Sequence, residues 1–326
     1  MQNSAEVSVI IINYGTADLT IKAVNSVLER DHGGRHVDVH LVDNASPGDD
    51  AHQLAEAAKS PLWTKHVTTY LETTNHGFGR GNNLVIERLA AQTAPPQKIM
   101  LLNPDATLDN DAIDVLAKAM DENPQIGFAG AAIAKPDTGP VTAAFRFPSI
   151  TSELIRTLGL NVIAKQFEHT AVALPPNLGT QQVDWVSGAA VMMRMEAIQS
   201  VGFFDPAYFL YYEEVDLMRR AGQNGWQSWH IAEAKVLHAE GAATGVGQSE
   251  RKRRPDYWYQ SWAHYFFKSY GPARAALLSV SMLGAAGLQS LKSILSGRPS
   301  KLPKSFGSDF TRTAVRPLLT GRSPLS

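Results

Sequence analysis

The chain has 326 residues, of which 44% are hydrophobic and 19% charged, so it can bury a large core and its composition is not that of a disordered protein. It contains no cysteine, which excludes disulfides, thiolate zinc sites and a cysteine nucleophile. The net charge of −1 hides an asymmetry, because residues 251–326 carry 13 Lys and Arg against 2 Asp and Glu. A basic C-terminal region favours an anionic partner.

Strands and helices are predicted to alternate over the first 134 residues. Short, β-branched apolar runs predict buried strands at 7–13, 37–43, 66–71, 99–103 and 126–134. Helical spacing of apolar residues predicts helices at 16–30, 49–59, 82–92 and 109–122. This alternation predicts an α/β fold with a mostly parallel sheet flanked by helices. The short apolar run at the N-terminus has no basic residues before it, which argues against a signal peptide.

The second half of the chain has a less regular pattern. Residues 135–182 have mixed polarity and receive no assignment, and 185–241 are predicted to form a strand, a helix and a strand. That helix opens at Glu213 and is expected to end before Gly222. The last two dozen residues, rich in Pro, Ser and basic side chains, are expected to be poorly ordered. We predict a domain of residues 1–249, with halves 1–134 and 135–249, followed by a basic, aromatic, helical tail of residues 250–326.

Three polar clusters follow predicted strands in the first half. They are Asn13 with Tyr14, the segment opened by Asp43, and Asn103-Pro104-Asp105. Such residues favour turns, and this alternative remains for any single cluster. Because the carboxyl ends of parallel strands meet at one edge of a sheet, three clusters together predict a ligand site there.

The segment NHGFGRGNN, residues 75–83, leads into the third predicted helix. Its glycines allow backbone N–H groups to approach an anion at the helix N-terminus, and Arg80 adds a charged donor. A dinucleotide-binding GxGxxG motif does not fit, because Asn82 or Leu84 occupies the place of the third glycine. An NAD(P)-dependent oxidoreductase is therefore disfavoured.

Acidic side chains are densest in FFDPAYFLYYEEVDL, where Glu213, Glu214 and Asp216 open the predicted helix. Carboxylates at a helix start also complement its dipole, which is the structural alternative. The preceding aromatic residues Tyr208, Phe209, Tyr211 and Tyr212 can raise the pKa of a neighbouring carboxyl, which suits a general base, and can stack on a sugar ring. The segment DWVSGAA, residues 184–190, adds an aromatic ring and small residues that let a ligand approach.

His238 ends the strand-like segment AKVLH. A lone histidine is more often structural than a ligand. Together with Asp105, however, its imidazole would form an oxygen-and-nitrogen site suited to Mn²⁺ or Mg²⁺.

The ordered set VSVIIINY, VDNAS, NxGFGxGNN, NPDA, WVSGA, YYEEVDL and a downstream histidine resembles the inverting family 2 glycosyltransferases of GT-A fold, in the rhamnosyltransferase and galactofuranosyltransferase branch. The resemblance covers roughly residues 6–245. It implies transfer of a sugar from a nucleotide-diphosphate sugar to a cell-surface polysaccharide or lipid-linked glycan, with dTDP-rhamnose expected first and UDP-galactofuranose second.

The resemblance also implies a role for each matching residue. Asp105 and His238 would bind the divalent metal. The family's base is the second residue of an acidic pair, usually Glu-Asp; here Glu214 takes that place in a Glu-Glu pair, and Glu213 and Asp216 remain alternatives. The expected nucleotide-sugar contacts are Asn13, Tyr14, Asp43, Asn75, Gly77, Gly79, Arg80, Asn83, Asn103, Trp185, Ser187 and Gly188.

The tail combines the aromatic run 257–270 with four basic residues at 251–254 and an apolar stretch at 275–291. This pattern predicts a peripheral contact with the anionic cytoplasmic face of the inner membrane, unless the aromatic residues pack inside the protein. Nothing else in the chain supports nucleic acid as the anionic partner. A non-catalytic nucleotide-sugar or glycan-binding module of the same fold is the alternative to an enzyme.

Overall fold

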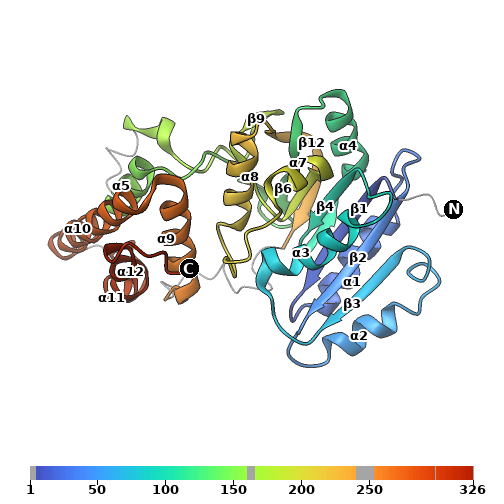
Figure 1. Cartoon of the computed structure of the whole chain (residues 1–326), viewed down its shortest axis with the longest axis horizontal. Coiled ribbons are helices and arrows are strands. Elements are labelled where there is room, and N and C mark those ends of the chain that lie inside the picture. Colours follow the sequence, from blue (N-terminus) through green and yellow to red (C-terminus); the bar gives the residue numbers. More distant parts are fainter. Residues whose placement is uncertain (1–4, 160–165, 240–252, 298, 326) are drawn as a thin grey trace. The chain divides into compact units, whose positions relative to one another are not determined.

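The computed structural model describes residues 5–159, 166–239, 253–297 and 299–325, which form two compact units (Figure 1). Unit 1 comprises residues 1–145, 173–205 and 214–247, and unit 2 comprises residues 146–172, 206–213 and 248–326. Unit 2 therefore contains the basic tail together with two earlier segments that the sequence analysis assigned to residues 1–249.

In the described residues, ten strands of unit 1 form one sheet, and eight of them follow the order β3-β2-β1-β4-β11-β6-β12-β5. The first four of these are parallel, and β11 runs antiparallel between β4 and β6. The strands are β1 (Val7–Asn13), β2 (Val37–Asn44), β3 (Val67–Glu72), β4 (Lys98–Leu102), β5 (Ala106–Leu108), β6 (Ile126–Lys135), β7 (Gly139–Val141), β8 (Ala144–Phe145), β9 (Gln181–Val183), β10 (Trp185–Val186), β11 (Ala190–Arg194) and β12 (Gln227–His238), with β8 and β10 forming a separate pair.

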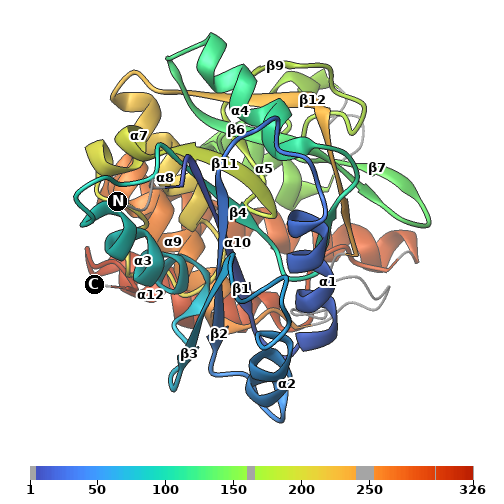
Figure 2. The same ribbon diagram turned by 90° about the vertical axis from the view of Figure 1, so that its right-hand side faces the viewer.

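Helices cover both faces of the sheet of unit 1 (Figure 2). Alternate residues of β1 point to opposite faces, so that Val9 belongs to the core cluster that contains α1 residues while Ile10 belongs to the cluster that contains α3 residues. The helices of unit 1 are α1 (Ala17–Leu28), α2 (Asp50–Ala57), α3 (Gly77–Ala90), α4 (Ala112–Glu122), α7 (Met195–Val201) and α8 (Glu213–Gln223), whose first residue is counted with unit 2. The predicted α/β class is confirmed.

Two predicted helix bounds are wrong. Helix α3 begins at Gly77, not at residue 82. Gly77 makes the turn into the helix with φ +73°, a conformation that glycine adopts easily, and the rest of the glycine-rich segment is helical. Helix α8 continues through Gly222 to Gln223, so this glycine does not end it. One glycine in a helix costs only about 1 kcal/mol relative to alanine, which packing can offset.

Unit 2 is helical in its described residues. It contains α5 (Ile150–Leu158), the 3₁₀ turn η1 (Glu168–Thr170), α9 (Asp256–Tyr270), α10 (Pro272–Ser296), α11 (Phe306–Phe310), the π-helical turn η2 (Thr311–Val315) and α12 (Arg316–Leu319). The expectation of a poorly ordered end is therefore wrong for residues 306–319, where Phe306, Phe310 and Leu318 are buried.

The aromatic run 257–270 forms the core of unit 2. Tyr259, Trp262, Tyr265 and Phe266 are fully buried on α9, and Phe310 of α11 packs edge-on against Trp262. These rings therefore do not form the exposed interfacial belt that the sequence suggested. By length and composition alone, α10 is the one helix among the described residues that is apolar enough to cross a membrane.

Candidate active site

Asn13 and Asp43 meet at the carboxyl ends of β1 and β2. The Asn13 amide donates to Asp43 Oδ1 at 2.8 Å and to Ser46 Oγ at 2.9 Å. Its carbonyl oxygen accepts from Thr20 Oγ1 at 2.7 Å. Asn13 is fully buried, whereas the neighbouring Tyr14 is 39% exposed. Asn13 thus fixes the position of the Asp43 carboxylate.

A second polar link joins β2 to the start of α3. Asn44 donates to Asn75 Oδ1 at 3.1 Å and to the Gly77 carbonyl at 3.0 Å, and it accepts from the His76 N–H at 2.9 Å. Asn75 Oδ1 also accepts from the Gly77 N–H at 2.8 Å. Asn44 was not among the predicted site residues, although it lies in the quoted VDNAS motif, and it holds the glycine-rich segment against the sheet edge.

The remaining polar residues of α3 point in different directions. Arg80 donates through Nε to the His76 carbonyl at 3.0 Å and is half-buried. Asn83 exchanges two hydrogen bonds with the backbone of Phe204, at 2.8 and 3.2 Å. Asn83 therefore fastens α3 to the segment that precedes α8. Gly79 is buried within the first turn of α3.

Asp105 and His238 are brought together by strand pairing. Ala106 of β5 lies opposite His238 of β12 in an antiparallel register, and His238 Nε2 is 2.9 Å from Asp105 Oδ1. Asn103 Nδ2 lies 3.3 Å from the same imidazole nitrogen. Both Asp105 and Asn103 follow the end of β4, as the sequence predicted.

This pair fits a divalent cation that is also held by substrate. A carboxylate and an imidazole are ligands that Mn²⁺ accepts, and Mg²⁺ is commonly bound by one or two protein groups together with substrate phosphates. Within the described ranges, no group of three or more His, Cys, Asp or Glu side chains is arranged to hold a metal by itself. The residues present therefore suit a metal ion whose other ligands are supplied by a bound substrate.

Glu214 lies beside the small residues of segment 184–190. A Cβ at Gly188 would come within 3.8 Å of Glu214 Oε1 and within 3.2 Å of the Phe78 ring, so glycine leaves space at this point. Glu214 Oε2 is buried without a hydrogen-bond partner in the described part of the chain. Burial raises the pKa of Glu214, and backbone N–H groups of Glu214 and Val215 only partly offset this effect. A carboxyl in this setting accepts a proton readily.

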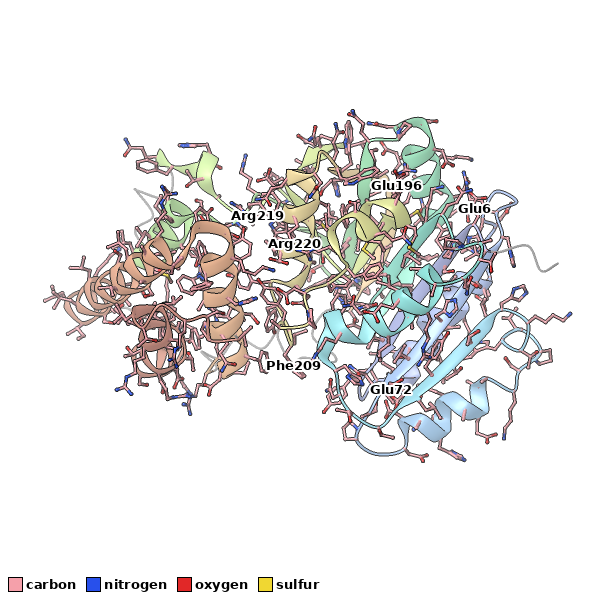
Figure 3. The ribbon with its side chains drawn as sticks, viewed as in Figure 1. Glu6, Glu72, Glu196, Phe209, Arg219 and Arg220 are labelled. Carbon is pink, nitrogen blue, oxygen red and sulfur yellow. The ribbon has the colours of Figure 1, made fainter. Side chains whose placement is uncertain are left out.

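Asp216 has a different environment from Glu214. Its Oδ2 accepts from Arg220 Nε at 2.8 Å, and the guanidinium also donates to the backbone carbonyls of Val201 and Phe203. The Arg220 side chain is labelled in Figure 3. Asp216 thus orients an arginine that ties α8 to the end of α7. Glu213 is 2% exposed and belongs to unit 2.

The other predicted residues of segment 184–190 lie on the small β8–β10 sheet or just after it. The Trp185 ring stacks on Phe145 with centroids 4.1 Å apart. The Ser187 hydroxyl accepts from the Ala189 N–H at 3.3 Å. In contrast, the predicted aromatic wall packs inside unit 2, where Phe209 and Tyr211 contact Tyr257.

Comparison with known proteins gives consistent matches. The model of the family "Glycosyl transferase family 2" matches residues 8–172. N-acetylglucosaminyl-diphospho-decaprenol L-rhamnosyltransferase of Mycobacterium tuberculosis is 30% identical over 225 residues, which are 65% of this chain and 69% of the relative. Rhamnosyltransferase WbbL of Escherichia coli is 22% identical over 219 residues, 64% of this chain and 80% of the relative.

Solved structures show the same fold. GalNAc-T7 with UDP, GalNAc and Mn²⁺ superimposes with a TM-score of 0.59 at 14% identity, over all of this chain and 59% of its own. The mannosyltransferase PcManGT of Pyrobaculum calidifontis, in complex with GDP-Man and Mn²⁺, gives 0.54 at 15% identity, over 99% of this chain and 86% of its own. The GT-A fold expected from the sequence is confirmed.

Proposed function

The chain belongs to glycosyltransferase family 2 and is a glycosyltransferase of the rhamnosyltransferase branch, and from this premise we propose that it moves a sugar from a nucleotide-diphosphate donor to a lipid-linked glycan with inversion of configuration. We propose dTDP-rhamnose as the first donor and UDP-galactofuranose as the second. The lipid-linked acceptor is suggested by the name of the mycobacterial relative, which acts on a decaprenol-linked N-acetylglucosaminyl diphosphate.

The observation that carries the mechanism is the unpartnered, buried oxygen of Glu214 beside Gly188. We assign Glu214 as the general base, because Asp216 is engaged by Arg220. The Glu214 carboxylate takes the proton of the acceptor hydroxyl, whose oxygen attacks the anomeric carbon from the face opposite the diphosphate. A single displacement of this kind inverts the anomeric configuration.

The donor is positioned by residues at the sheet edge. We propose that Asp43, held by Asn13, binds the nucleoside, while Tyr14 lies open beside it. Asp105 and His238 would hold a Mn²⁺ or Mg²⁺ ion, whose charge would stabilise the departing nucleoside diphosphate. We propose that the N-terminus of α3, with Arg80, attracts a phosphate of the donor, because a helix N-terminus favours negative charge.

We also propose that unit 2 lies on the anionic cytoplasmic face of the membrane. Its described residues include 12 Lys and Arg against 5 Asp and Glu. One side of α10 packs on α5, α9 and α12, while Leu277, Leu288 and Leu295 on the same helix are each more than 60% exposed. An apolar helix face on a basic body is typical of proteins that lie in the membrane interface.

The test is nucleoside-diphosphate release from a panel of nucleotide sugars, with Mn²⁺, with Mg²⁺ and with EDTA. We expect slow hydrolysis or acceptor transfer with one donor, and its loss in EDTA. An Asp105→Asn variant should lose the thermal shift that metal and donor together produce. Donor-dependent thermal shifts without release in the presence of a lipid-linked acceptor would instead favour a binding module. If no donor shifts the melting temperature, the donor assignment is wrong.

A further inference from the structure

Unit 2 contains a cavity of about 350 Å³ that the proposed transfer reaction does not use. It is bounded by α5, α10 and residues 301–306, and it has the size of small-ligand sites. Three cationic side chains, Arg156, Arg254 and Lys301, line it, and none of its described lining residues is acidic.

The two arginines of this cavity lie close enough to repel each other. Arg156 pairs with the buried Glu153 at 2.6 Å, and that carboxylate also accepts from Trp262 Nε1 at 2.9 Å. Arg254 lies over the Trp258 ring, 3.8 Å from its centroid. Burial lowers the pKa of Arg254, and the nearby positive charge of Arg156 lowers it further. Three cationic side chains and no acidic one thus line this cavity in the described residues, and a bound anion would relieve the repulsion between Arg156 and Arg254.

Gln289 brings a further polar group to the same cavity from α10. Its side chain is 5% exposed, and its Oε1 has no hydrogen-bond partner in the part of the chain that the structure describes. A Cβ at Gly159 would lie 2.9 Å from the Gln289 amide nitrogen, so the glycine that ends α5 makes room for this amide. A primary amide offers an acceptor at one end and two donors at the other, so turning it presents N–H groups to an anion.

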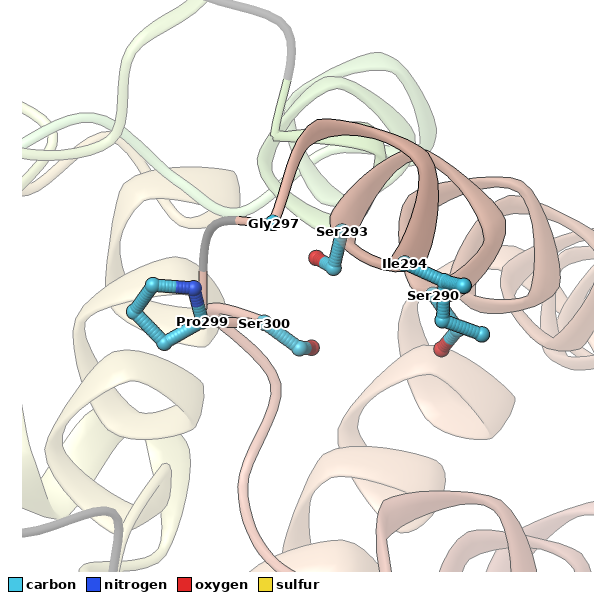
Figure 4. A pocket seen from close by; sticks show the side chains of 6 residues that line it. All are labelled: Ser290, Ser293, Ile294, Gly297, Pro299 and Ser300. Atoms are coloured by element: carbon cyan, nitrogen blue, oxygen red, sulfur yellow. The ribbon is translucent and has the colours of Figure 1, made fainter.

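We infer that this cavity binds the phosphate group of an anionic membrane lipid, an inference that rests on the proposed membrane contact of unit 2. Guanidinium groups recognise phosphate through paired hydrogen bonds, and Lys301 adds a point charge. A lipid is favoured over free phosphate because the helix that supplies Gln289 also carries the exposed Leu288 and Leu291. The hollow at the C-terminal end of α10 has only serine, glycine, proline and isoleucine among its described lining residues and offers no comparable site (Figure 4).

The experiment measures binding of the full chain to phosphatidylcholine vesicles with and without phosphatidylglycerol. Lys301→Gln removes a cavity charge, and Arg156→Lys keeps the charge but removes the planar fork. Arg316→Gln is the matched control, because it removes an exposed charge of unit 2 that does not line the cavity. Melting temperatures confirm that each variant is folded.

We expect Lys301→Gln to weaken binding to the anionic vesicles about fivefold, the effect of about 1 kcal/mol per basic residue at a membrane. Arg156→Lys should weaken it as well, Arg316→Gln much less, and binding to neutral vesicles should be equal in all. Equal losses for Lys301→Gln and Arg316→Gln, with Arg156→Lys like wild type, would overturn the site in favour of diffuse charge.

Two further outcomes distinguish a lipid phosphate from free phosphate as the ligand, and the lipid site from the proposed transferase function. If inorganic phosphate raises the melting temperature of the wild type but not of Lys301→Gln, while all variants bind vesicles equally, the ligand is free phosphate and the lipid assignment fails. If the wild type binds no vesicle, the lipid assignment fails too. Donor hydrolysis is measured in parallel and should be unchanged in these variants, so failure of the transferase proposal is seen independently.

Discussion

Glu214 and Asp216 lie two positions apart on α8, and their oxygens are held in opposite ways. Glu214 has a buried oxygen without a partner in the described residues, whereas Asp216 is engaged by the Arg220 guanidinium. Because burial disfavours the charged form of Glu214, this carboxylate is poised to take up a proton. At the scale of single residues, we propose that this difference separates a chemical role for Glu214 from a positioning role for Asp216.

Glu214→Gln should therefore lower turnover by roughly 10²–10⁴-fold, which is the usual contribution of a general base. Donor binding should be kept, and the melting temperature should stay the same or rise, because a neutral amide replaces a buried group whose charged form is disfavoured. The measurements are initial rates, donor titration and thermal unfolding. Loss of stability without loss of rate would contradict the assignment.

The same assignment predicts the pH dependence of turnover. The pKa of Glu214 is raised above the usual 4.5 by burial, so protonation inactivates the base as the pH falls through that raised value. The acid limb of the wild-type rate profile should therefore lie above pH 4.5. A rate profile that stays flat down to this pH would exclude Glu214 as the titrating base.

At the scale of elements, Arg220 joins α8 to the end of α7. Its guanidinium donates hydrogen bonds to the Asp216 carboxylate and to the backbone carbonyls of Val201 and Phe203. Asn83 fastens α3 to the next residue, Phe204, so three helices converge on residues 201–204. Residues 201–204 are thus held in place by side chains of α3 and α8, which are distant from each other in the sequence.

Asp216→Asn should destabilise the fold by about 1–3 kcal/mol, since it replaces a charge-assisted hydrogen bond at a buried site with a neutral one. It should reduce turnover less than Glu214→Gln does. Denaturant unfolding of both variants provides the comparison. If Asp216→Asn keeps its stability and loses activity like a base variant, then Asp216 and not Glu214 performs the chemistry.

The spacing of apolar residues predicted helices and strands well where the burial of those residues determines the secondary structure. The run 7–13 is β-branched and apolar, and it forms β1 with the same bounds. The sheet-edge cluster was predictable because parallel strands end together. The start of α3 was missed because glycine has a low helix propensity. The pairing of Asp105 with His238 could be hypothesised, but their contact depends on the register between β5 and β12, which no local pattern encodes.

At the scale of the whole molecule, the sequence did not predict which segments of the chain form unit 2. Residues 146–172 and 206–213 have no local sign of belonging with the tail, and their membership depends on long-range packing. The Trp262 indole donates to Glu153 and the Tyr270 hydroxyl donates to the Pro148 carbonyl, both about 110 or more residues apart in sequence. The spacing of apolar residues along one helix or strand cannot predict contacts between residues so far apart in the sequence.

Removing residues 250–326 should therefore not leave a well-folded remainder. Glu153 would lose the Trp262 indole, and Tyr212 would lose its ring contacts with Trp258 and Tyr265. We expect the shortened chain to be largely insoluble or aggregated in size-exclusion chromatography, whereas the full chain carrying Arg316→Gln should elute normally. A monomeric 1–249 fragment with an unchanged melting temperature would show that the tail, residues 250–326, is a separable appendage.

The discontinuous path of unit 2 also sets an order of events during synthesis. Residue 172, which ends the segment 146–172, is synthesised about 80 residues before residue 253, which lies just before α9. At translation rates of about 5–20 residues per second, this segment waits roughly 4–16 s for the helices it packs against. Chaperones that shield apolar nascent segments would therefore have their main opportunity on this protein in the interval between the two.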